Sequence, residues 1–295
     1  MSKRVAILGN CQVNGMANCL RAIDPDLKLK AYHMARYRSD AAQKKAMEEL
    51  AGVDCIFSQP LNDGAYGDLR AAELTNRFPN VLLYPSLIFH GFHPDAIFMP
   101  QNGRSVPAPC GIYHSAIVVA AFLNSVPRQR VARLFNAYVF SRLGYLQHFE
   151  TWKKYFLTRA GEIGFDLSAD IDAWLADGVF MHTGNHPAVR VIASVAAKLY
   201  RNWTTSEPAV PSGVRDVLSR AEKVPVYADI ARTIGVKPVT CFESKIDRAT
   251  GKRRSIDLDE FIFDSFALYE SSSPAVFKSA RVKRAVEFLQ EEFVA

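Results

Sequence analysis

The sequence lacks the long hydrophobic run that a membrane-spanning helix needs. Such a helix takes about 18 or more consecutive apolar residues. The longest candidate, from Ser115 to Val126, is too short and contains Asn124. The first four residues, Met-Ser-Lys-Arg, lead directly into a strand-like run without the apolar segment of a signal peptide. We therefore expect a cytoplasmic protein with no membrane span.

Cysteines are few and scattered. No two of them form a C-x-x-C pair, so neither a zinc ribbon nor a redox dithiol is indicated. A disulfide scaffold would also be surprising in a chain of this length in the cytoplasm. Most of them are expected to be small core residues, and only the first has a setting that suggests chemistry. The five are Cys11, Cys19, Cys55, Cys110 and Cys241.

The charge is only mildly basic. Lys and Arg number 36 against 30 Asp and Glu, a formal net charge of +6. The basic residues are spread out apart from a run at 252–254, and no nucleic-acid motif occurs, so we expect no nucleic-acid partner. The excess of positive charge would suit a polyanionic ligand, such as a phosphorylated cofactor or a nucleotide-linked sugar. A solvated basic surface without a ligand explains it equally well. His90 and His93 lack the carboxylate or cysteine spacing of a metal site, so no metal is expected.

The first third of the chain alternates between strand-like and helical patterns. Apolar strand-like runs occur at residues 5–8, 27–32, 54–57 and 81–84, and helical patterns at 13–23, 39–50 and part of 63–78. Strands that alternate with helices predict an α/β fold with a parallel sheet and helices on both faces.

The pattern changes after about residue 90. Segments 90–95 and 100–109 are rich in Gly and Pro and are expected to be loops. The rest is largely helical, with predicted helices in 112–159, 170–175, 188–203, 214–223, 227–234, 258–268 and 280–293 and a late strand at 239–242. We expect residues 1–110 to form the α/β part that carries the nucleophile. Residues 111–295 would form a mainly helical part that packs with it as one unit.

Asn10, Cys11 and Gln12 follow the first predicted strand and begin the first helix. Ligands of parallel α/β sheets collect outside the carboxyl ends of the strands. The positive end of the helix dipole favours a thiolate at Cys11, and backbone N–H groups of the same turn can point at an oxyanion. Cys11 is thus a candidate nucleophile, although a buried first-turn cysteine without chemistry fits the same position.

Two further side chains fit a site around Cys11. Gln59 ends the third strand at the same edge of the sheet, so its amide can help Asn10 and backbone N–H groups to bind an oxyanion. His186 lies in a polar turn before a helix, where Pro187 suits the first helical position and His186 can act as a general base. His182 could orient His186 or be structural.

An ordered set of short motifs resembles the WcbI family. The set is Gly9-Asn10-Cys11-Gln12, Ser58-Gln59-Pro60, Tyr84-Pro85-Ser86 and Asn185-His186-Pro187, and the resemblance covers roughly residues 3–205. These bacterial capsule and polysaccharide-biosynthesis proteins are regarded as acetyltransferases that bind coenzyme A. The resemblance implies transfer of an acetyl group from acetyl-CoA to a sugar hydroxyl of a capsular polysaccharide or its precursor. It leaves a peripheral association with a polysaccharide assembly complex open.

The layout is also similar, at a distance, to the SGNH hydrolases. In that family a Ser follows the first strand, an amide side chain helps to form the oxyanion hole, and a late His is the base. Here Cys11 would replace the Ser and Gln59 the Asn, while Thr183 stands where the family has an Asp. A hydrolase or thioesterase with the same dyad is therefore an alternative function. A non-catalytic sugar- or nucleotide-binding protein is another.

Candidate CoA-binding residues follow the second and fourth strands. Arg36 and Arg38 come directly after the second strand and can meet the phosphates of CoA. The loops after the fourth strand are long enough to act as a lid or acceptor site. They supply the other candidates, Ser86, His90, His93 and Arg104.

Overall fold

The computed structural model describes residues 2–101, 104–272 and 279–293 and divides into two compact units. Unit 1 consists of Met1–Ile88, Tyr155–Phe180 and Asn185–Leu218. Unit 2 consists of Phe89–Lys154, Met181–Gly184 and Ser219–Ala295. Each unit thus draws on segments from both sides of residue 110.

Unit 1 is built on a four-stranded parallel sheet, as the sequence predicts. The strands β1 (Arg4–Gly9), β2 (Lys28–His33), β3 (Cys55–Ser58) and β4 (Val81–Leu83) lie in the order β2-β1-β3-β4. This is the flavodoxin-like order, in which the chain changes direction across the sheet between β1 and β3. The crevice at the carboxyl ends of β1 and β3 is therefore where a ligand is expected.

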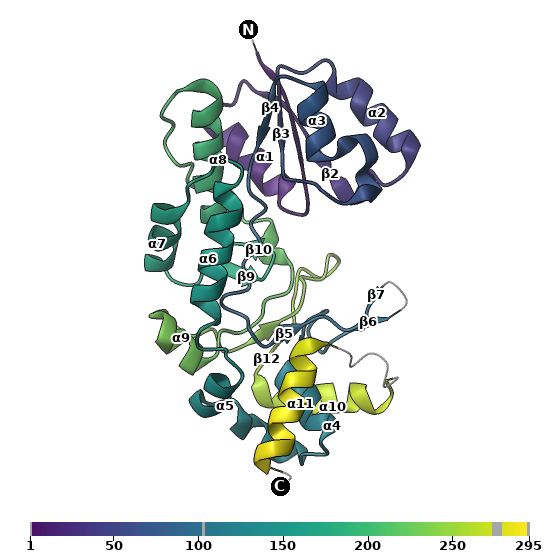
Figure 1. The fold of residues 1–295 in the computed structure, drawn as a ribbon, viewed down its shortest axis with the longest axis vertical. Helices are drawn as coiled ribbons and strands as arrows, with labels where there is room; N and C mark the ends of the chain where they lie inside the picture. Colours follow the sequence, from purple (N-terminus) through teal and green to yellow (C-terminus); the bar gives the residue numbers. More distant parts are fainter. Residues whose placement is uncertain (1, 102–103, 273–278, 294–295) are drawn as a thin grey trace. The chain divides into compact units, whose positions relative to one another are not determined.

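Helices cover both faces of this sheet (Figure 1). Ala6 and Leu8 of β1 point to one face, where α2 (Asp40–Leu50) and α3 (Ala71–Arg77) pack on them. Successive side chains of a strand alternate, so Val5 and Ile7 point to the opposite face. There α1 (Val13–Ile23) packs on α8 (Val189–Thr204). The helix α2 begins with a side-chain cap, because Ser39 Oγ accepts a hydrogen bond from Ala42 N–H.

The remaining elements are short strands, 3-10 turns and helices, so the predicted α/β fold with a largely helical later part is confirmed. Unit 1 also holds η1 (Met34–Arg36), η2 (Gly64–Leu69), α7 (Ser168–Ala176) and β10 (His186–Pro187). The first helix of unit 2, α4 (Ala116–Leu123), is apolar all round and packs on α10 (Leu258–Glu270) and α11 (Ala280–Phe293). The others are β5 (Ala96–Ile97), β6 (Pro100–Gln101), β7 (Arg104–Ser105), β8 (His114–Ser115), η3 (Arg128–Leu134), α5 (Ala137–Arg142), α6 (His148–Gly161), β9 (Met181–Thr183), η4 (Leu218–Arg220), α9 (Ala228–Ile234), β11 (Phe242–Glu243) and β12 (Ser255–Ile256).

The predicted helix at residues 214–223 is wrong. Only the 3-10 turn η4 forms there, because the end of the segment pairs with a distant strand instead. Lys223 N–H donates to Glu243 O at 2.9 Å, and Glu243 N–H donates to Lys223 O at 3.0 Å. Within the described ranges, no helix is both long and apolar enough to cross a membrane.

Gly9 ends β1 at a point where a methyl group would collide with two buried side chains. An ideal Cβ there would lie 2.5 Å from Tyr84 Oη and 2.9 Å from Gln59 Oε1. We expect Gly9→Ala to lower the free energy of unfolding by about 1–3 kcal/mol, measured by urea denaturation, because both buried groups must shift. Gly64→Ala is the control, since a Cβ at Gly64 meets nothing within 4 Å. Equal denaturation midpoints for the two variants would contradict the prediction.

Candidate active site

The turn between β1 and α1 is fixed by its own hydrogen bonds. Asn10 Oδ1 accepts from Gln12 N–H at 2.9 Å, and the Asn10 carbonyl accepts from Val13 N–H at 3.1 Å. Gln12 is the N-cap residue of α1 but makes no side-chain cap bond. Its side chain is therefore available for bonds to other segments.

The Gln12 amide makes every hydrogen bond that an amide can make. Nε2 donates to the carbonyls of Leu87 at 2.8 Å and Asn185 at 2.9 Å. Oε1 accepts from Leu87 N–H at 3.0 Å and from Gln59 Nε2 at 3.1 Å. Two donor and two acceptor bonds saturate the group, which is only 1% exposed. Gln12 thus joins the ends of β1 and β3, the segment after β4 and the segment before α8.

Gln59 is a second buried member of this network. Its Oε1 accepts from Asn10 N–H at 2.8 Å while its Nε2 donates to Gln12, and the residue is 2% exposed. Asn10 Nδ2 in turn donates to Ser86 Oγ at 3.2 Å. The structure therefore brings four of the predicted site residues together: Asn10, Gln12, Gln59 and Ser86.

Cys11 is a partly exposed free thiol between two members of this network. Burial raises the pKa of the thiol above its ordinary value, and a backbone hydrogen bond at the same residue lowers it by less. Desolvation therefore opposes the stabilisation of a thiolate that is expected from the start of α1. The thiol is protonated at neutral pH and needs a base to become a nucleophile.

His186 lies in β10, two residues before the N-cap of α8. The prediction that Pro187 occupies the first helical position is wrong, because the helix begins at Val189 with Ala188 as its N-cap. Ala188 N–H donates to Phe180 O at 2.9 Å, which keeps this backbone extended. The carbonyl of Asn185, directly before His186, is the one that accepts from Gln12. One hydrogen bond therefore links the chain neighbours of the predicted nucleophile and the predicted base.

The two arginines after β2 are both exposed. Arg36 ends the turn η1. Arg38 stacks over the Tyr66 ring with 5.5 Å between the guanidinium carbon and the ring centroid, and its Nη2 lies 3.8 Å from Asp63 Oδ2. Surface pairs of this kind are weak, so Arg38 can leave them for a ligand at little cost.

His90 and His93 lie in unit 2. The His90 ring lies 4.7 Å, centroid to centroid, from the Trp152 ring and contacts Gly184 closely enough that any side chain there would collide with it. His93 is 2% exposed. The backbone of Arg104 lies in β7, while its side chain falls outside the described part of the structure. Within the described part, no group of three or more His, Cys, Asp or Glu residues is placed to hold a metal ion.

Burial keeps three histidines near the start of unit 2 neutral, namely His90, His93 and His148. It lowers the pKa of His90 to about 4, with help from the positive charge of Arg281. It lowers the pKa of His93 to about 3, with help from His90, and that of His148 to about 4, with help from Arg281. His182 lies in β9 of the same unit, where its carbonyl accepts from Val224 N–H at 3.1 Å.

The edge of the unit 1 sheet also holds His33, a residue that the sequence patterns do not single out. His33 is the last residue of β2 and lies in register with Gly9 of β1. Among the described residues, no hydrogen-bond partner reaches its buried Nδ1. The expected strand ended at Tyr32, and an extension by one residue would have placed His33 at the same edge as Cys11.

Comparison with known proteins identifies the family. A model of the family described as "Polysaccharide biosynthesis enzyme WcbI" matches residues 4–208. The chain belongs to the WcbI family. The predicted resemblance is thereby confirmed, and the WcbI match covers both the turn that carries Cys11 and the segment that carries His186.

A solved WcbI structure shares the fold. It superposes with a TM-score of 0.66 at 17% sequence identity, and the match covers 100% of this chain and 96% of that one. It is described as the native form of a novel polysaccharide biosynthesis enzyme, without a disulfide bond between CoA and one of its cysteines. No curated protein matches the sequence.

Replacement of Gln12 tests how much the site depends on its amide. Gln12→Leu leaves two carbonyls, one N–H and one amide hydrogen without their partner, so we expect a loss of roughly 3 kcal/mol in the free energy of unfolding. Gln43→Leu is the matched control, because Gln43 Nε2 makes only two bonds, to Tyr37 O at 3.2 Å and Ala65 O at 2.9 Å. Chemical denaturation of both variants measures the difference. An equal or smaller loss for Gln12→Leu would contradict the prediction.

The neutral histidines predict acid sensitivity. Their folded pKa values lie below the ordinary 6.5, so their contribution to stability is complete above pH 6.5 and is lost as the pH falls toward 3. Each can lower the free energy of unfolding by up to about 1.4 kcal/mol per pH unit in that window. We expect His93→Gln to flatten this slope in urea denaturation measured from pH 7 to pH 4. An unchanged slope would show that His93 is not among the residues responsible.

Proposed function

We propose that this chain is an O-acetyltransferase that moves an acetyl group from acetyl-CoA to a hydroxyl of a capsular polysaccharide sugar or its precursor. The hydrogen bond from Gln12 to the Asn185 carbonyl carries the proposal, because it connects the segments of Cys11 and His186. The family is one of polysaccharide biosynthesis enzymes. The similar WcbI structure is described in terms of CoA and a cysteine, which supports CoA as the co-substrate.

In the first half of the proposed reaction, His186 takes the proton from Cys11 Sγ and the thiolate attacks the acetyl carbonyl. The bond from the acetyl carbon to the CoA sulfur breaks, and the departing CoA thiolate takes the proton from His186. A thiol with a raised pKa is not ionised in advance, which is why this step needs a base. Gln59 Nε2 carries two hydrogens, and in the described residues one of them is donated to Gln12. The second amide hydrogen can then be donated to the oxyanion.

In the second half, a sugar hydroxyl attacks the acetyl-cysteine while His186 takes its proton. The acetyl–sulfur bond breaks, an ester forms on the sugar, and Cys11 regains its proton from His186. The sum is acetyl-CoA plus an alcohol giving an ester plus CoA. Because the first exchange replaces one thioester with another, a cysteine relay requires little free energy.

For CoA itself we propose contacts on the same side of unit 1. Arg36 and Arg38 would meet its phosphates, since guanidinium groups bind phosphate oxygens in pairs. Ser86 is tied to Asn10 of the active-site turn and would border the thioester end. The roles expected for His90, His93 and Arg104 stay predictions.

Substitution of the dyad tests the proposal. We expect Cys11→Ala and His186→Gln each to lower the rate of acetyl transfer from acetyl-CoA by about 10³-fold or more, as for other covalent catalytic groups. Mass spectrometry of the wild-type protein mixed with acetyl-CoA, without acceptor, should find one acetyl group on Cys11. Cys241→Ala is the control, because Cys241 is also a partly exposed free thiol.

Two outcomes would contradict this mechanism. A Cys11→Ala protein with nearly full activity would exclude the covalent relay. Release of free CoA and acetate in excess over acetylated sugar would instead indicate a hydrolase with the same dyad.

A further inference from the structure

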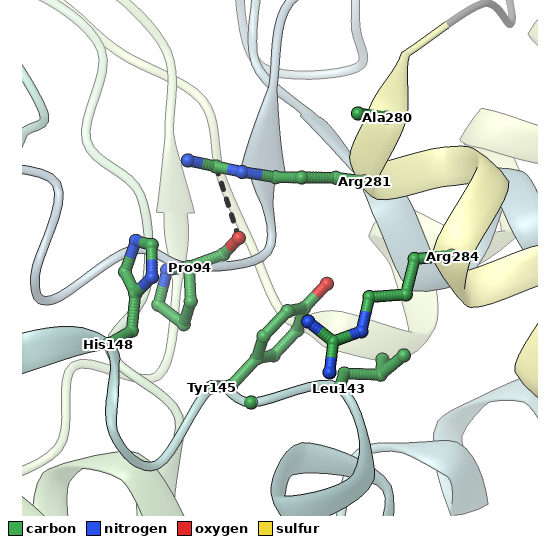
Figure 2. A pocket seen from close by; sticks show the side chains of 8 residues that line it. Pro94, Leu143, Tyr145, His148, Ala280, Arg281 and Arg284 are labelled. Atoms are coloured by element: carbon green, nitrogen blue, oxygen red, sulfur yellow. Dashed lines mark hydrogen bonds between the residues drawn. The ribbon is translucent and has the colours of Figure 1, made fainter. Parts of the chain in front are cut away.

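Unit 2 contains a cavity of roughly 280 Å³ beside the first turn of α11 (Figure 2). The segment between α5 and α6 forms one wall, and the N-terminal turns of α11 form another. The lining residues are Pro94, Leu143, Gly144, Tyr145, His148, Ala280, Arg281 and Arg284. Its volume is at the lower end of the range of small-molecule pockets.

Two arginines of one helix border this cavity. Arg281 and Arg284 are three residues apart on α11 and therefore lie on the same helix face. Arg281 Nη1 donates to Pro94 O at 3.1 Å and Ala96 O at 2.9 Å, and Arg284 Nη2 donates to Arg142 O at 3.2 Å. In the part of the chain that the structure describes, both guanidinium groups bond only to uncharged carbonyls. These bonds fix the guanidinium groups in place without neutralising them.

The acidic groups near the cavity are engaged elsewhere. Asp95 is 2% exposed, and its carboxyl accepts hydrogen bonds from Ile117 N–H at 3.0 Å, from the Tyr227 hydroxyl at 3.1 Å and from the hydroxyl of the lining residue Tyr145 at 3.3 Å. Burial raises the pKa of this carboxyl, while its hydrogen bonds lower it by less. None of the described residues that line the cavity is acidic. Glu292 pairs with Arg142 at 3.0 Å. The cavity wall therefore carries an excess of positive charge.

His148 adds a neutral polar group to the same wall. In the described residues its buried Nε2 has no hydrogen-bond partner. Burial and Arg281 hold its pKa near 4, so the ring is uncharged at neutral pH and can present an N–H to a ligand. Figure 2 shows the His148 ring beside Pro94, across the cavity from Arg284.

We propose that this cavity binds a phosphate group. Guanidinium groups bind phosphate oxygens through paired, charge-assisted hydrogen bonds, and the start of a helix favours an anion. A volume of roughly 280 Å³ holds a phosphate with a small organic group but not a whole nucleotide cofactor. The phosphate has two chemical sources here, a phosphorylated sugar and a phosphate of CoA. The proposal does not depend on the chemistry assigned to Cys11 and His186.

Calorimetric titration of the full chain with inorganic phosphate, glucose 1-phosphate and acetate tests this site. We expect both phosphates to bind and acetate to bind more weakly. Arg284→Gln should weaken phosphate binding by about tenfold, the effect of one charge-assisted hydrogen bond. Arg281→Lys keeps the positive charge and a donor for the backbone carbonyls but loses the paired donors of a guanidinium group. We expect it to weaken phosphate binding as well. Lys283→Gln is the matched control, since Lys283 lies between them on α11 with a side chain that is 78% exposed.

The source of the phosphate follows from a second pair of titrations, with CoA and dephospho-CoA. If Arg284→Gln weakens binding of CoA but not of dephospho-CoA, the site takes the phosphate by which the two differ. If Arg284→Gln weakens only the binding of glucose 1-phosphate, the site takes a phosphorylated sugar. The proposal is overturned if phosphate does not bind, if acetate binds as tightly, or if Lys283→Gln weakens binding as much as Arg284→Gln. None of these readouts involves acetyl transfer, so a failure here leaves the proposal for Cys11 and His186 untouched.

Discussion

The arrangement of unit 1 around the turn between β1 and α1 depends on the saturated amide of Gln12. Each of its four bonds satisfies a buried donor or acceptor, and leaving one such group unsatisfied costs about 1–3 kcal/mol, more than the net gain from one hydrogen bond. The amide therefore favours a single arrangement of its partners. Those partners belong to segments that the chain brings together from far apart. The bond to Asn185 spans 173 residues of sequence, and the bond to Leu87 spans 75. At this turn, hydrogen bonds from the N-cap residue of α1 hold the segments together, whereas apolar packing holds the rest of the sheet.

Much of this fold could be predicted because its signals are local. The apolar run of β1, the start of α1 at Val13 and the cap at Ser39 are each specified within a few residues, and the structure confirms them. The exceptions are segments whose backbone bonds go to distant partners. Lys223 pairs with Glu243 rather than continuing a helix, and Ala188 bonds to Phe180 rather than allowing α8 to begin at Pro187. A pattern of residue types cannot show such partners.

The sequence predicted which residues lie together at this turn better than it predicted what each side chain does there. The end of β1 and the end of β3 had to lie at one edge of a parallel sheet, so Asn10, Gln12 and Gln59 were correctly grouped. Their division of labour depends on side-chain direction, which the sequence does not give. The oxyanion role of Gln59 stays a prediction; the structure adds that its side-chain oxygen and one of its amide hydrogens hold the turn in place. The pKa of Cys11 likewise depends on how much water reaches the sulfur, which local sequence leaves undetermined.

The protonated state of Cys11 has a consequence for the lifetime of the protein. Peroxides and disulfides react with thiolates, and oxidation follows thiolate character and exposure. Because burial raises the pKa of Cys11, a smaller fraction of this partly exposed thiol is ionised at a given pH than in a cysteine with the ordinary pKa, which slows both reactions. The same burial that makes a base necessary for nucleophilic attack therefore also slows the accidental oxidation of Cys11.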